Sequence, residues 1–498
     1  MKMCHSEAQP KKLGLSFGVK ILRVAQDDRQ TTIFRAIGVL AVYEVISGGY
    51  RVKKTITVIQ TAKDNGDRLS LKEELFFSKG GTPLGTVIEI DQKNKYQVFE
   101  GFGAAFTEAA ADTFYKMSEE KRTEILNAYF SPGAGLNYSF CRTHINSCDF
   151  SLGNYSYDEV AGDAEMHHFD IERDRLQLMP MIKEAMKVKG ENLKLFASPW
   201  SPPGWMKTNG EMNHGGKLKD EYKKSWALYF AKYIKAYAKE GIPIWGVSVQ
   251  NEPDAVQIWD SCTYSHEEER DFVRNYLGPV LQEEGLCHVR IIVWDHNTDL
   301  IYERAKVILE DKECAKYVWG VGFHWYSGDQ FANLEKTHQA FPDKKLLFTE
   351  GCQEGGVHWD LWSVGERYGH NIINDFNNWT VGWVDWNMVL NEQGGPNHAG
   401  NYCDAPIIAN TQSDKIYYEN SYYYMGHFSK YIQLGATRLG CICKEEGTLE
   451  ATAFENPDGQ IVVVLMNPGD EERDYVLKIG ENTTSAKSLP HSIVTLLC

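Results

Sequence analysis

Eight strand-like runs alternate with helical segments between residues 98 and about 390, and this alternation constrains the fold more than any other feature. Residues 220–240 give the clearest amphipathic helix, with Asp220 as its expected N-cap and Gly241 as its stop. Eight β/α repeats of this length predict one (β/α)8 barrel. The apolar or β-rich runs lie near residues 99–106, 136–145, 193–200, 242–251, 289–297, 318–326, 344–350 and 381–390.

Short strand patterns on both sides of the barrel predict a second domain. Residues 449–454 and 461–466 flank an Asn-Pro-Asp-Gly turn sequence, and further strand-like runs lie between residues 54 and 98. We therefore expect a β-sandwich made from residues 52–97 and 431–498, attached to a barrel of residues 98–430.

The first 51 residues show neither a sustained period nor a motif. Gly48-Gly49 fits a ribosome-binding sequence in the gene, and Val52 fits a GTG start codon. We therefore expect this segment to be an extension upstream of the true start. Mass spectrometry of the N-terminus of natively expressed protein tests this hypothesis, which peptides from residues 1–51 would contradict.

Charge and cysteine content narrow the possible partners and the compartment. The net charge of −16 argues against nucleic acid and against unaided binding to anionic membranes. The 11 cysteines are odd in number and lack zinc-site spacing, which indicates a reduced, cytoplasmic protein. The apolar run at residues 36–43 is too short for an integral membrane segment, and no signal peptide is recognised. The oligomeric state is not predicted.

Two glutamates stand at the ends of the fourth and seventh predicted strands. Glu252 follows residues 244–251 within an Asn-Glu-Pro sequence, and Glu350 ends residues 345–349 before a glycine. Either glutamate alone could be structural. In a barrel, however, both strand ends open on the same face, and two facing carboxylates are the reactive groups of a glycosidase.

Other predicted strand ends also carry polar or aromatic side chains. A packing or ion-pair role explains any one of them, but not their presence at nearly every strand end. No dinucleotide, Walker or nucleophile-elbow motif is present, and the histidines form no metal-ligand pair, so we expect neither a cofactor nor a metal. The candidates are Arg142, Asp149, Trp200, Asn251, His324, Tyr326, Trp386 and Asn397.

From residue 98 to its end the chain resembles glycoside hydrolase family 30, the family of glucosylceramidases and β-1,6-glucanases. The sequence Trp294-Asp295-His296-Asn297 departs from glucosylceramidases of the human type, which carry a glutamine there. The motifs that carry the resemblance are residues 100–111 (Glu-Gly-Phe-Gly-Ala-Ala-Phe-Thr-Glu-Ala-Ala-Ala), 147–151 (Ser-Cys-Asp-Phe-Ser), 197–200 (Ala-Ser-Pro-Trp), 205–210 (Trp-Met-Lys-Thr-Asn-Gly), 251–253 (Asn-Glu-Pro), 324–326 (His-Trp-Tyr), 382–387 (Gly-Trp-Val-Asp-Trp-Asn), 394–397 (Gly-Gly-Pro-Asn) and 426–430 (Gly-His-Phe-Ser-Lys).

The resemblance implies a retaining β-glycosidase in which Glu252 is the acid/base and Glu350 the nucleophile. We expect Arg142 to lower the pKa of Glu350, and the negative charge of Glu350 to raise the pKa of Glu252. The resemblance also implies supporting roles for Arg142, His324 and Tyr326. It places five residues around the terminal sugar: Asp149, Trp200, Asn251, Trp386 and Asn397.

The leading hypothesis is an exo-acting β-glucosidase of the glucosylceramidase type, whose partner is a β-glucoside, either an oligosaccharide or a glycolipid. An endo-β-1,6-glucanase or a β-xylosidase on the same barrel is the nearest alternative. An inactive carbohydrate-binding protein is an alternative from a different class.

Overall fold

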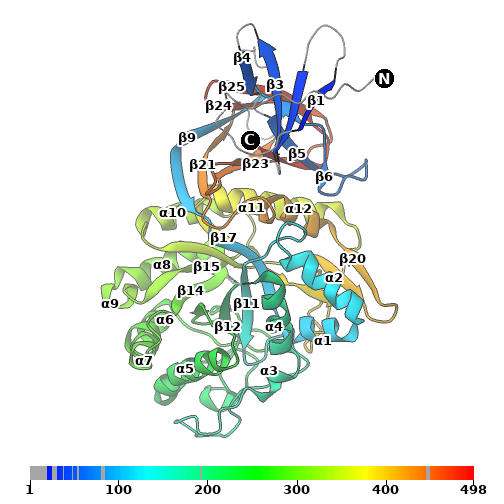
Figure 1. The fold of residues 1–498 in the computed structure, drawn as a ribbon. Coiled ribbons are helices and arrows are strands. Elements are labelled where there is room, and N and C mark those ends of the chain that lie inside the picture. The colour runs from blue at the N-terminus through cyan, green and yellow to red at the C-terminus, as the bar shows by residue number, and fades with distance from the viewer. Residues whose placement is uncertain are drawn as a thin grey trace.

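A closed barrel of eight parallel strands forms the centre of the larger body (Figure 1). A computed structural model describes residues 20–24, 31–36, 39–46, 49–52, 55–79, 85–190, 193–444 and 449–498. The predicted fold class is confirmed. In barrel order the strands are β10 (Gly101–Phe106), β11 (Phe140–Ile145), β12 (Lys194–Pro199), β13 (Gly246–Ser248), β14 (Arg290–Asn297), β15 (Val318–His324), β16 (Lys345–Glu350) and β17 (Thr380–Asn387).

Helices surround the barrel, and short 3-10 turns lie at Gly204–Met206, Asp220–Tyr222 and Thr298–Leu300. Among the described residues, none of the helices combines the length and apolar character needed to cross a membrane. The helices are α1 (Glu108–Lys116), α2 (Glu119–Phe130), α3 (Glu172–Leu176), α4 (Leu178–Lys189), α5 (Lys223–Lys239), α6 (His266–Phe272), the π-helical turn η3 (Val273–Leu277), α7 (Gly278–Glu283), α8 (Ile301–Glu310), α9 (Lys312–Ala315), α10 (Phe331–Ala340), α11 (Trp362–Asn377) and α12 (Asn420–Ser429).

The predicted helix at residues 220–240 forms, but its predicted N-cap is wrong. Asp220 begins a 3-10 turn, and α5 starts only at Lys223. The Asp220 carboxylate pairs with the Lys223 ammonium at 2.6 Å instead of accepting a hydrogen bond from the helix backbone. Gly241 does follow the helix end, with a φ of +82° that favours glycine.

The fourth and eighth barrel strands are shorter than predicted. Strand pairing in β13 stops at Ser248, because the chain then turns toward Glu252, whose φ is +49°. The run predicted at 381–390 ends at Asn387 and continues as a separate strand. That strand, β18 (Val389–Asn391), forms a small sheet with β19 (Ile407–Asn410) and β20 (Lys415–Tyr418).

The β-sandwich contains strands from both sides of the barrel in sequence. Its long strand β9 pairs with β21 on one edge and β24 on the other, while β26 lies between β5 and β23. The strands are β5 (Thr55–Ala62), β6 (Ser70–Leu71), β7 (Leu75–Phe76), β8 (Ser78–Lys79), β9 (Thr86–Val98), β21 (Thr437–Cys443), β22 (Glu450–Glu455), β23 (Ile461–Asn467), β24 (Arg473–Ile479), β25 (Asn482–Ser488) and β26 (Ser492–Leu497).

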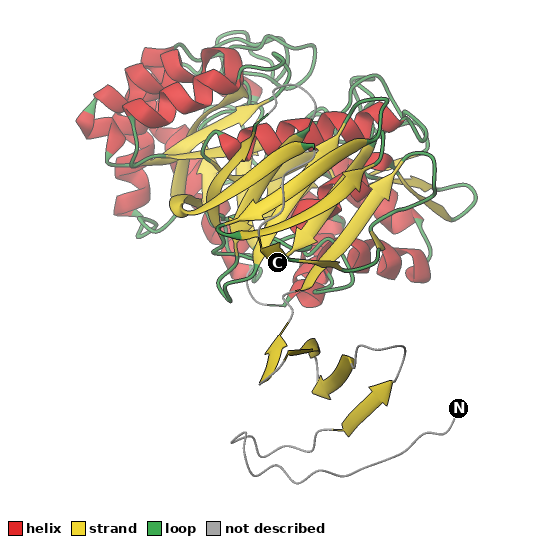
Figure 2. Cartoon of the chain, turned by 90° about the horizontal axis from the view of Figure 1, so that it is seen from above, coloured by secondary structure: helices red, strands yellow, loops and turns green. Residues whose placement is uncertain are grey.

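Alternate residues of β23 join the two domains. Val463 and Leu465 belong to the core inside the sandwich, whereas Val464 and Met466 belong to the core shared with the barrel helices. This follows from the two-residue period of a strand, which sends neighbouring side chains to opposite faces. Figure 2 shows the broad sheet packed against helices.

A separate antiparallel sheet lies within the first 52 residues, where the sequence shows no sustained period. In Figure 2 it stands apart from the sandwich. The proposed start at Val52 remains a prediction, and residues 1–19 lie outside the described residues. The strands are β1 (Lys20–Val24), β2 (Thr31–Ala36), β3 (Val39–Ile46) and β4 (Gly49–Val52).

His370 on α11 links the barrel to the sandwich. Its Nδ1 lies 2.9 Å from Glu450 on β22, and its Nε2 lies 3.1 Å from Asp329 in the loop after β15. The hydrogen bond with Glu450 raises the pKa of His370 to about 9. The hydrogen bond with Asp329 also raises it, whereas burial lowers it. The folded chain therefore binds this proton more tightly than the unfolded chain, in which the histidine pKa is about 6.5.

His370→Gln is expected to destabilise the fold in a pH-dependent way. The raised pKa gives stability that is complete below about pH 6.5 and lost as the pH rises through about 9. The free energy of unfolding should fall by about 1 kcal/mol near pH 6, since the pair is partly exposed, and by less near pH 10. Urea unfolding at both pH values measures this.

His338→Gln is the matched control. Burial lowers the pKa of His338, which stacks on Trp379 with ring centroids 3.6 Å apart. The stability that neutral His338 contributes to the fold is lost as the pH falls. The loss of unfolding free energy caused by this substitution should therefore not shrink at high pH. The same pH trend in both variants would contradict the assigned role of His370.

Candidate active site

The barrel interior changes from apolar to polar along the strand direction. Near the amino ends a buried cluster contains Phe140 on β11 and Phe196 on β12. Two residues further on, in the same inward direction, stand Arg142 and Ser198, both fully buried. The carboxyl ends of the strands therefore carry the chemistry, as in other barrels of this type.

A cavity of about 260 Å³ opens at these carboxyl ends. This is below the range of about 300–1,000 Å³ typical of drug-sized sites, so its size suits one sugar ring. Of the predicted residues, Arg142, His324 and Asn397 do not line it. It is lined by Asp149, Trp200, Asn251, Glu252, Gln257, Trp259, His296, Asn297, Tyr326, Glu350, Cys352, Glu354, Trp386, Asn401 and Cys403.

Glu350 ends β16 and is held from two sides. Arg142 Nη1 donates to its Oε2 at 2.6 Å, and the Tyr326 hydroxyl donates to its Oε1 at 3.1 Å. These are the two contacts of Glu350 made by residues for which the resemblance implies supporting roles, and those roles remain predictions. The contacts fix the carboxylate on the cavity wall without covering it, because Glu350 still lines the cavity.

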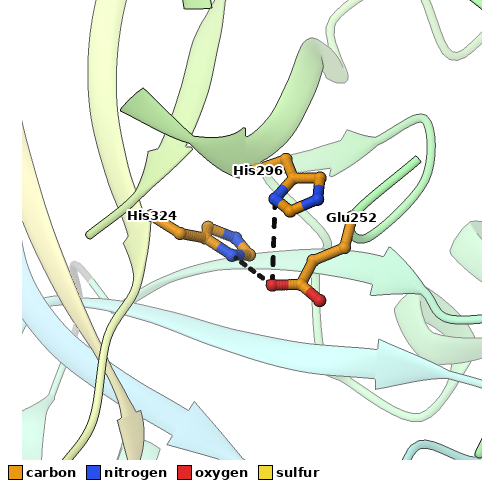
Figure 3. Close-up of side chains that lie close together, drawn as sticks. All are labelled: Glu252, His296 and His324. Carbon is orange, nitrogen blue, oxygen red and sulfur yellow. Dashed lines mark hydrogen bonds and ion pairs between the residues drawn. The ribbon is translucent and has the colours of Figure 1, made fainter. Parts of the chain in front are cut away.

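Glu252 lies in the turn after β13, in a left-handed backbone conformation. Its backbone N–H donates to the Asp295 carbonyl at 3.0 Å, which secures this conformation. Its Oε1 lies 3.2 Å from His324 Nδ1 and 3.9 Å from His296 Nδ1, and Figure 3 shows both imidazoles close to the carboxylate.

Asp295 is a site residue to which the sequence argument assigned no role. The pairing of β14 with β15 jumps from Trp294 to His296, so Asp295 is a bulge that turns into the barrel. There it accepts hydrogen bonds from Arg142 at 2.9 Å and from Ser198 at 3.0 Å. The sequence offered one sign of this role, which is a carboxylate at the end of a buried strand. The bulge that turns the side chain into the barrel has no recognisable sequence pattern.

His324 connects the two glutamates. Its Nδ1 lies 3.2 Å from Glu252 Oε1 and 3.9 Å from Glu350 Oε1, while its Nε2 lies 3.1 Å from Asp295 Oδ1. Burial disfavours the protonated, charged form of His324, but these three carboxylates favour it and raise the pKa of His324 to about 9. At neutral pH the site therefore holds a proton on this imidazole.

The pKa order expected for the two glutamates is reversed. Burial favours the neutral form of Glu252, but the hydrogen bond with His324 and the charges of His296, His324 and Arg142 together outweigh it and hold the pKa of Glu252 below its usual value. Burial raises the pKa of Glu350 despite His324 and Arg142. The expected order rested on Arg142 and on the mutual repulsion of the glutamates, whereas in the structure both carboxylates also lie beside the imidazolium of His324.

Asp149 lies deep in the cavity, with its Oδ2 bound by two amides. Asn397 Nδ2 donates to it at 3.2 Å and Asn401 Nδ2 at 3.0 Å. Burial raises the pKa of Asp149 to about 7, although both amides oppose the shift. Asn397, expected against the sugar, thus lies behind Asp149, and Asn401 takes the place on the cavity wall.

Two stacked tryptophans form one side of the cavity. The rings of Trp200 and Trp386 lie 5.0 Å apart at 22°, with the Arg142 guanidinium 4.8 Å from the Trp200 ring centre. Asn251 Oδ1 accepts from Arg142 Nη2 at 2.8 Å, which leaves the Asn251 NH2 group available to a ligand. The flat apolar rings and the amide donor suit the C–H face and the hydroxyls of a sugar.

The arrangement places the carboxyl groups of Glu252 and Glu350 beside the same nitrogen of one imidazole, His324 Nδ1, at the open end of a barrel. Such a pair can attack a glycosidic carbon on one side and protonate the leaving oxygen on the other. Within the described ranges, three ligand-type side chains also gather closely enough for a metal ion: Glu252, His296 and His324.

Comparison with known protein families matches both domains in order. The glycosyl hydrolase family 30 TIM-barrel domain matches residues 99–432, and the family 30 β-sandwich domain matches residues 435–496. Lysosomal acid glucosylceramidase of Mus musculus is 34% identical over 93% of this chain and 90% of its own length. Putative glucosylceramidase 3 of Caenorhabditis elegans is 38% identical over 88% of each chain.

Solved structures also match this chain over most of its length. SrfJ from Salmonella typhimurium superposes with a TM-score of 0.86 at 37% identity, covering 89% of this chain and 99% of its own. The endo-β1,6-glucanase BT3312 superposes with a TM-score of 0.80 at 28% identity and the same coverage. Because both domains match in order and these relatives span most of the chain, the protein is a glycoside hydrolase and belongs to glycosyl hydrolase family 30.

Proposed function

We propose that this protein is a retaining, exo-acting β-glucosidase of the glucosylceramidase type. The observation that carries the proposal is the placement of Glu252 and Glu350, both within 3.9 Å of His324 Nδ1 at the carboxyl ends of β13 and β16. Retaining enzymes need two carboxyl groups about 5–5.5 Å apart, close enough for direct attack.

In the first step, Glu350 attacks the anomeric carbon and forms a glycosyl-enzyme ester. The contacts from Arg142 and Tyr326 orient the carboxylate for this attack. The leaving oxygen takes a proton from Glu252. We propose that this proton comes from His324 Nδ1, which holds it 3.2 Å from Glu252 Oε1.

In the second step, Glu252 removes a proton from water, and the water oxygen attacks the glycosyl ester. Ester formation has by then neutralised Glu350, so one of the negative charges that favour protonation of His324 is gone. As Glu350 regains its negative charge, the proton taken from water passes from Glu252 back to His324 Nδ1, which restores the initial state of the site. Two displacements at one carbon retain the β configuration.

The cavity size and the relatives together support the exo-glucosidase assignment. A cavity with room for one sugar ring, lined by Asp149, suits a terminal residue better than the middle of a chain. The relatives named as glucosylceramidases are 34–38% identical to this chain. Relatives named endo-1,6-β-D-glucanase are 28–29% identical, one of them over 96% of this chain, so a β-1,6-glucanase is the second candidate.

A product profile tests the proposal. Purified protein is incubated separately with glucosylceramide, gentiobiose, a β-xyloside and β-1,6-glucan, and the products are followed over time. Glucose released from chain ends and from glucosylceramide supports the proposal. Oligosaccharides released internally from the glucan identify the second candidate, and the absence of hydrolysis of any of the four substrates would contradict both candidates.

Asp149→Ala is expected to lower kcat/KM by an amount equal to about 2–4 kcal/mol of transition-state stabilisation, because the hydrogen bonds between a buried carboxyl group and the sugar are lost. The loss should shrink on a deoxy-glucoside that lacks the contacted hydroxyl, since a polar site discriminates against analogues that leave it unpaired. The measurement is a cycle of protein change against substrate change. Equal losses on both substrates would make Asp149 a structural residue.

We also propose that the protein works in a reducing compartment, as expected for the cytoplasm. The cysteine pattern of the sequence supports this.

A further inference from the structure

His296 has no role in the chemistry proposed above, yet its ring faces the same carboxylate as His324 (Figure 3). One ligand atom from each of Glu252, His296 and His324 lies within 4.8 Å of the others. Two imidazoles and a carboxylate are ligands that zinc commonly takes in proteins.

The distances from Glu252 to the two histidines lie near those of tetrahedral coordination, and all three ligand atoms lie within 4.8 Å of one another. Zinc bonds of about 2.0–2.2 Å separate neighbouring ligand atoms by roughly 3.3 Å. Glu252 Oε1 lies 3.2 Å from His324 Nδ1 and 3.9 Å from His296 Nδ1. Small side-chain shifts therefore bring three ligands to one ion. Glu252 and His296 line the cavity, which leaves room for water at the fourth position.

Both imidazoles are already oriented. His324 Nε2 contacts Asp295 Oδ1 at 3.1 Å, the carboxylate–histidine contact that fixes metal-ligating histidines. His296 stacks on Trp294 with ring centroids 5.1 Å apart. Its Nδ1 accepts from the Asn297 N–H at 2.8 Å, so that nitrogen is unprotonated, and a metal ion would replace this N–H as its partner.

We propose that a divalent transition-metal ion, zinc first among them, binds Glu252, His296 and His324 and reversibly inhibits the enzyme. The ion bonds to Glu252 Oε1 and to both Nδ1 atoms, and the proton on His324 leaves to solvent. Imidazole ligands select zinc, copper and nickel over magnesium and calcium. The inhibition rests on the proposed role of Glu252 as the acid, whereas the binding does not.

Inhibition kinetics give the first test. Zinc should compete with an aryl β-glucoside, and magnesium at the same concentration should have no effect. Because binding displaces one proton, the inhibition constant should tighten about tenfold per unit between about pH 6 and 7. The titratable groups around His324 are Glu252, Asp295, His296, Tyr326 and Glu350.

His296→Asn should raise the zinc inhibition constant at least about 30-fold, in the range expected when a metal site is impaired. His214→Asn is the control, because His214 pairs with Glu211 at 2.9 Å on the surface and would bind zinc adventitiously. It should change the inhibition constant less than about twofold. Equal sensitivity of wild type and His296→Asn to zinc would overturn the proposal.

Cobalt titration provides a readout that does not depend on activity. Wild-type protein should give the visible bands of tetrahedral cobalt without a thiolate charge-transfer band, and Glu252→Gln should weaken cobalt binding even though that variant turns over poorly. A thiolate band would place the ion on cysteine instead, and the absence of cobalt binding at millimolar concentration would exclude the site. Cobalt binding without zinc inhibition would keep the site and refute the proposed role of Glu252.

Discussion

Glu350→Gln is expected to lower the turnover of β-glucosides about 10³–10⁵-fold while leaving the fold intact. The amide keeps the shape of the side chain but cannot form the glycosyl ester, so covalent catalysis is lost. Arg142 still pairs with Asp295 at 2.9 Å, which keeps its charge compensated in the variant. The measurements are kcat on an aryl β-glucoside and the intact mass after reaction with a 2-fluoro-glucoside, which should label wild type only.

Glu354→Gln is the matched control, because this carboxylate also lines the cavity but pairs with Arg367 at 3.0 Å near the surface. Its kcat should stay within a few-fold of wild type. Azide is expected to give at most an α-glycosyl azide with Glu350→Gln, and no rescue of the β product. Near-full activity of Glu350→Gln, or its labelling by the 2-fluoro-glucoside, would show that another residue is the nucleophile.

Glu252→Ala is expected to affect substrates according to their leaving groups. An aryl leaving group needs little protonation, so the first step should survive better on aryl than on alkyl β-glucosides, for which losses should reach about 10²–10⁴-fold. The second step loses its base and should become slow. Burst kinetics on the two substrate types, compared with wild type, measure both effects.

Azide distinguishes the two glutamates. In Glu252→Ala the glycosyl ester still forms on Glu350, and azide needs no base to attack it. Azide should therefore speed turnover and give a β-glycosyl azide, the opposite outcome from Glu350→Gln. Equal losses on aryl and alkyl substrates, with no response to azide, would argue against the acid/base role of Glu252.

The order of strands and the strand-end positions of the two glutamates could be predicted because they follow from local pattern. The amphipathic period of α5 and the apolar runs of the barrel strands are direct consequences of which face is buried. The ends of elements were less predictable. Asp220 fits an N-cap by residue type, but a lysine three residues later competes for its carboxylate.

The electrostatics of the site could not be predicted, because they depend on contacts between distant segments. Asp295 enters the barrel only through a bulge, and the positive charge of His324 depends on three carboxylates from other strands or turns. The pKa order of Glu252 and Glu350 reverses as a result. Asn401 was missed for a related reason, since a loop brings it to Asp149 beside the expected Asn397.

The position of β26 has a consequence for synthesis on the ribosome. The barrel strands lie within a continuous stretch from Gly101 to Asn387, so this domain can begin to form while the chain is still emerging. Strand β5 is made much earlier, yet its partner β26 ends only at Leu497. The edge of β5 that pairs with β26 therefore stays unpaired until nearly the whole chain has been made. An mRNA truncated near its 3′ end would give a folded barrel attached to an incomplete, aggregation-prone sheet.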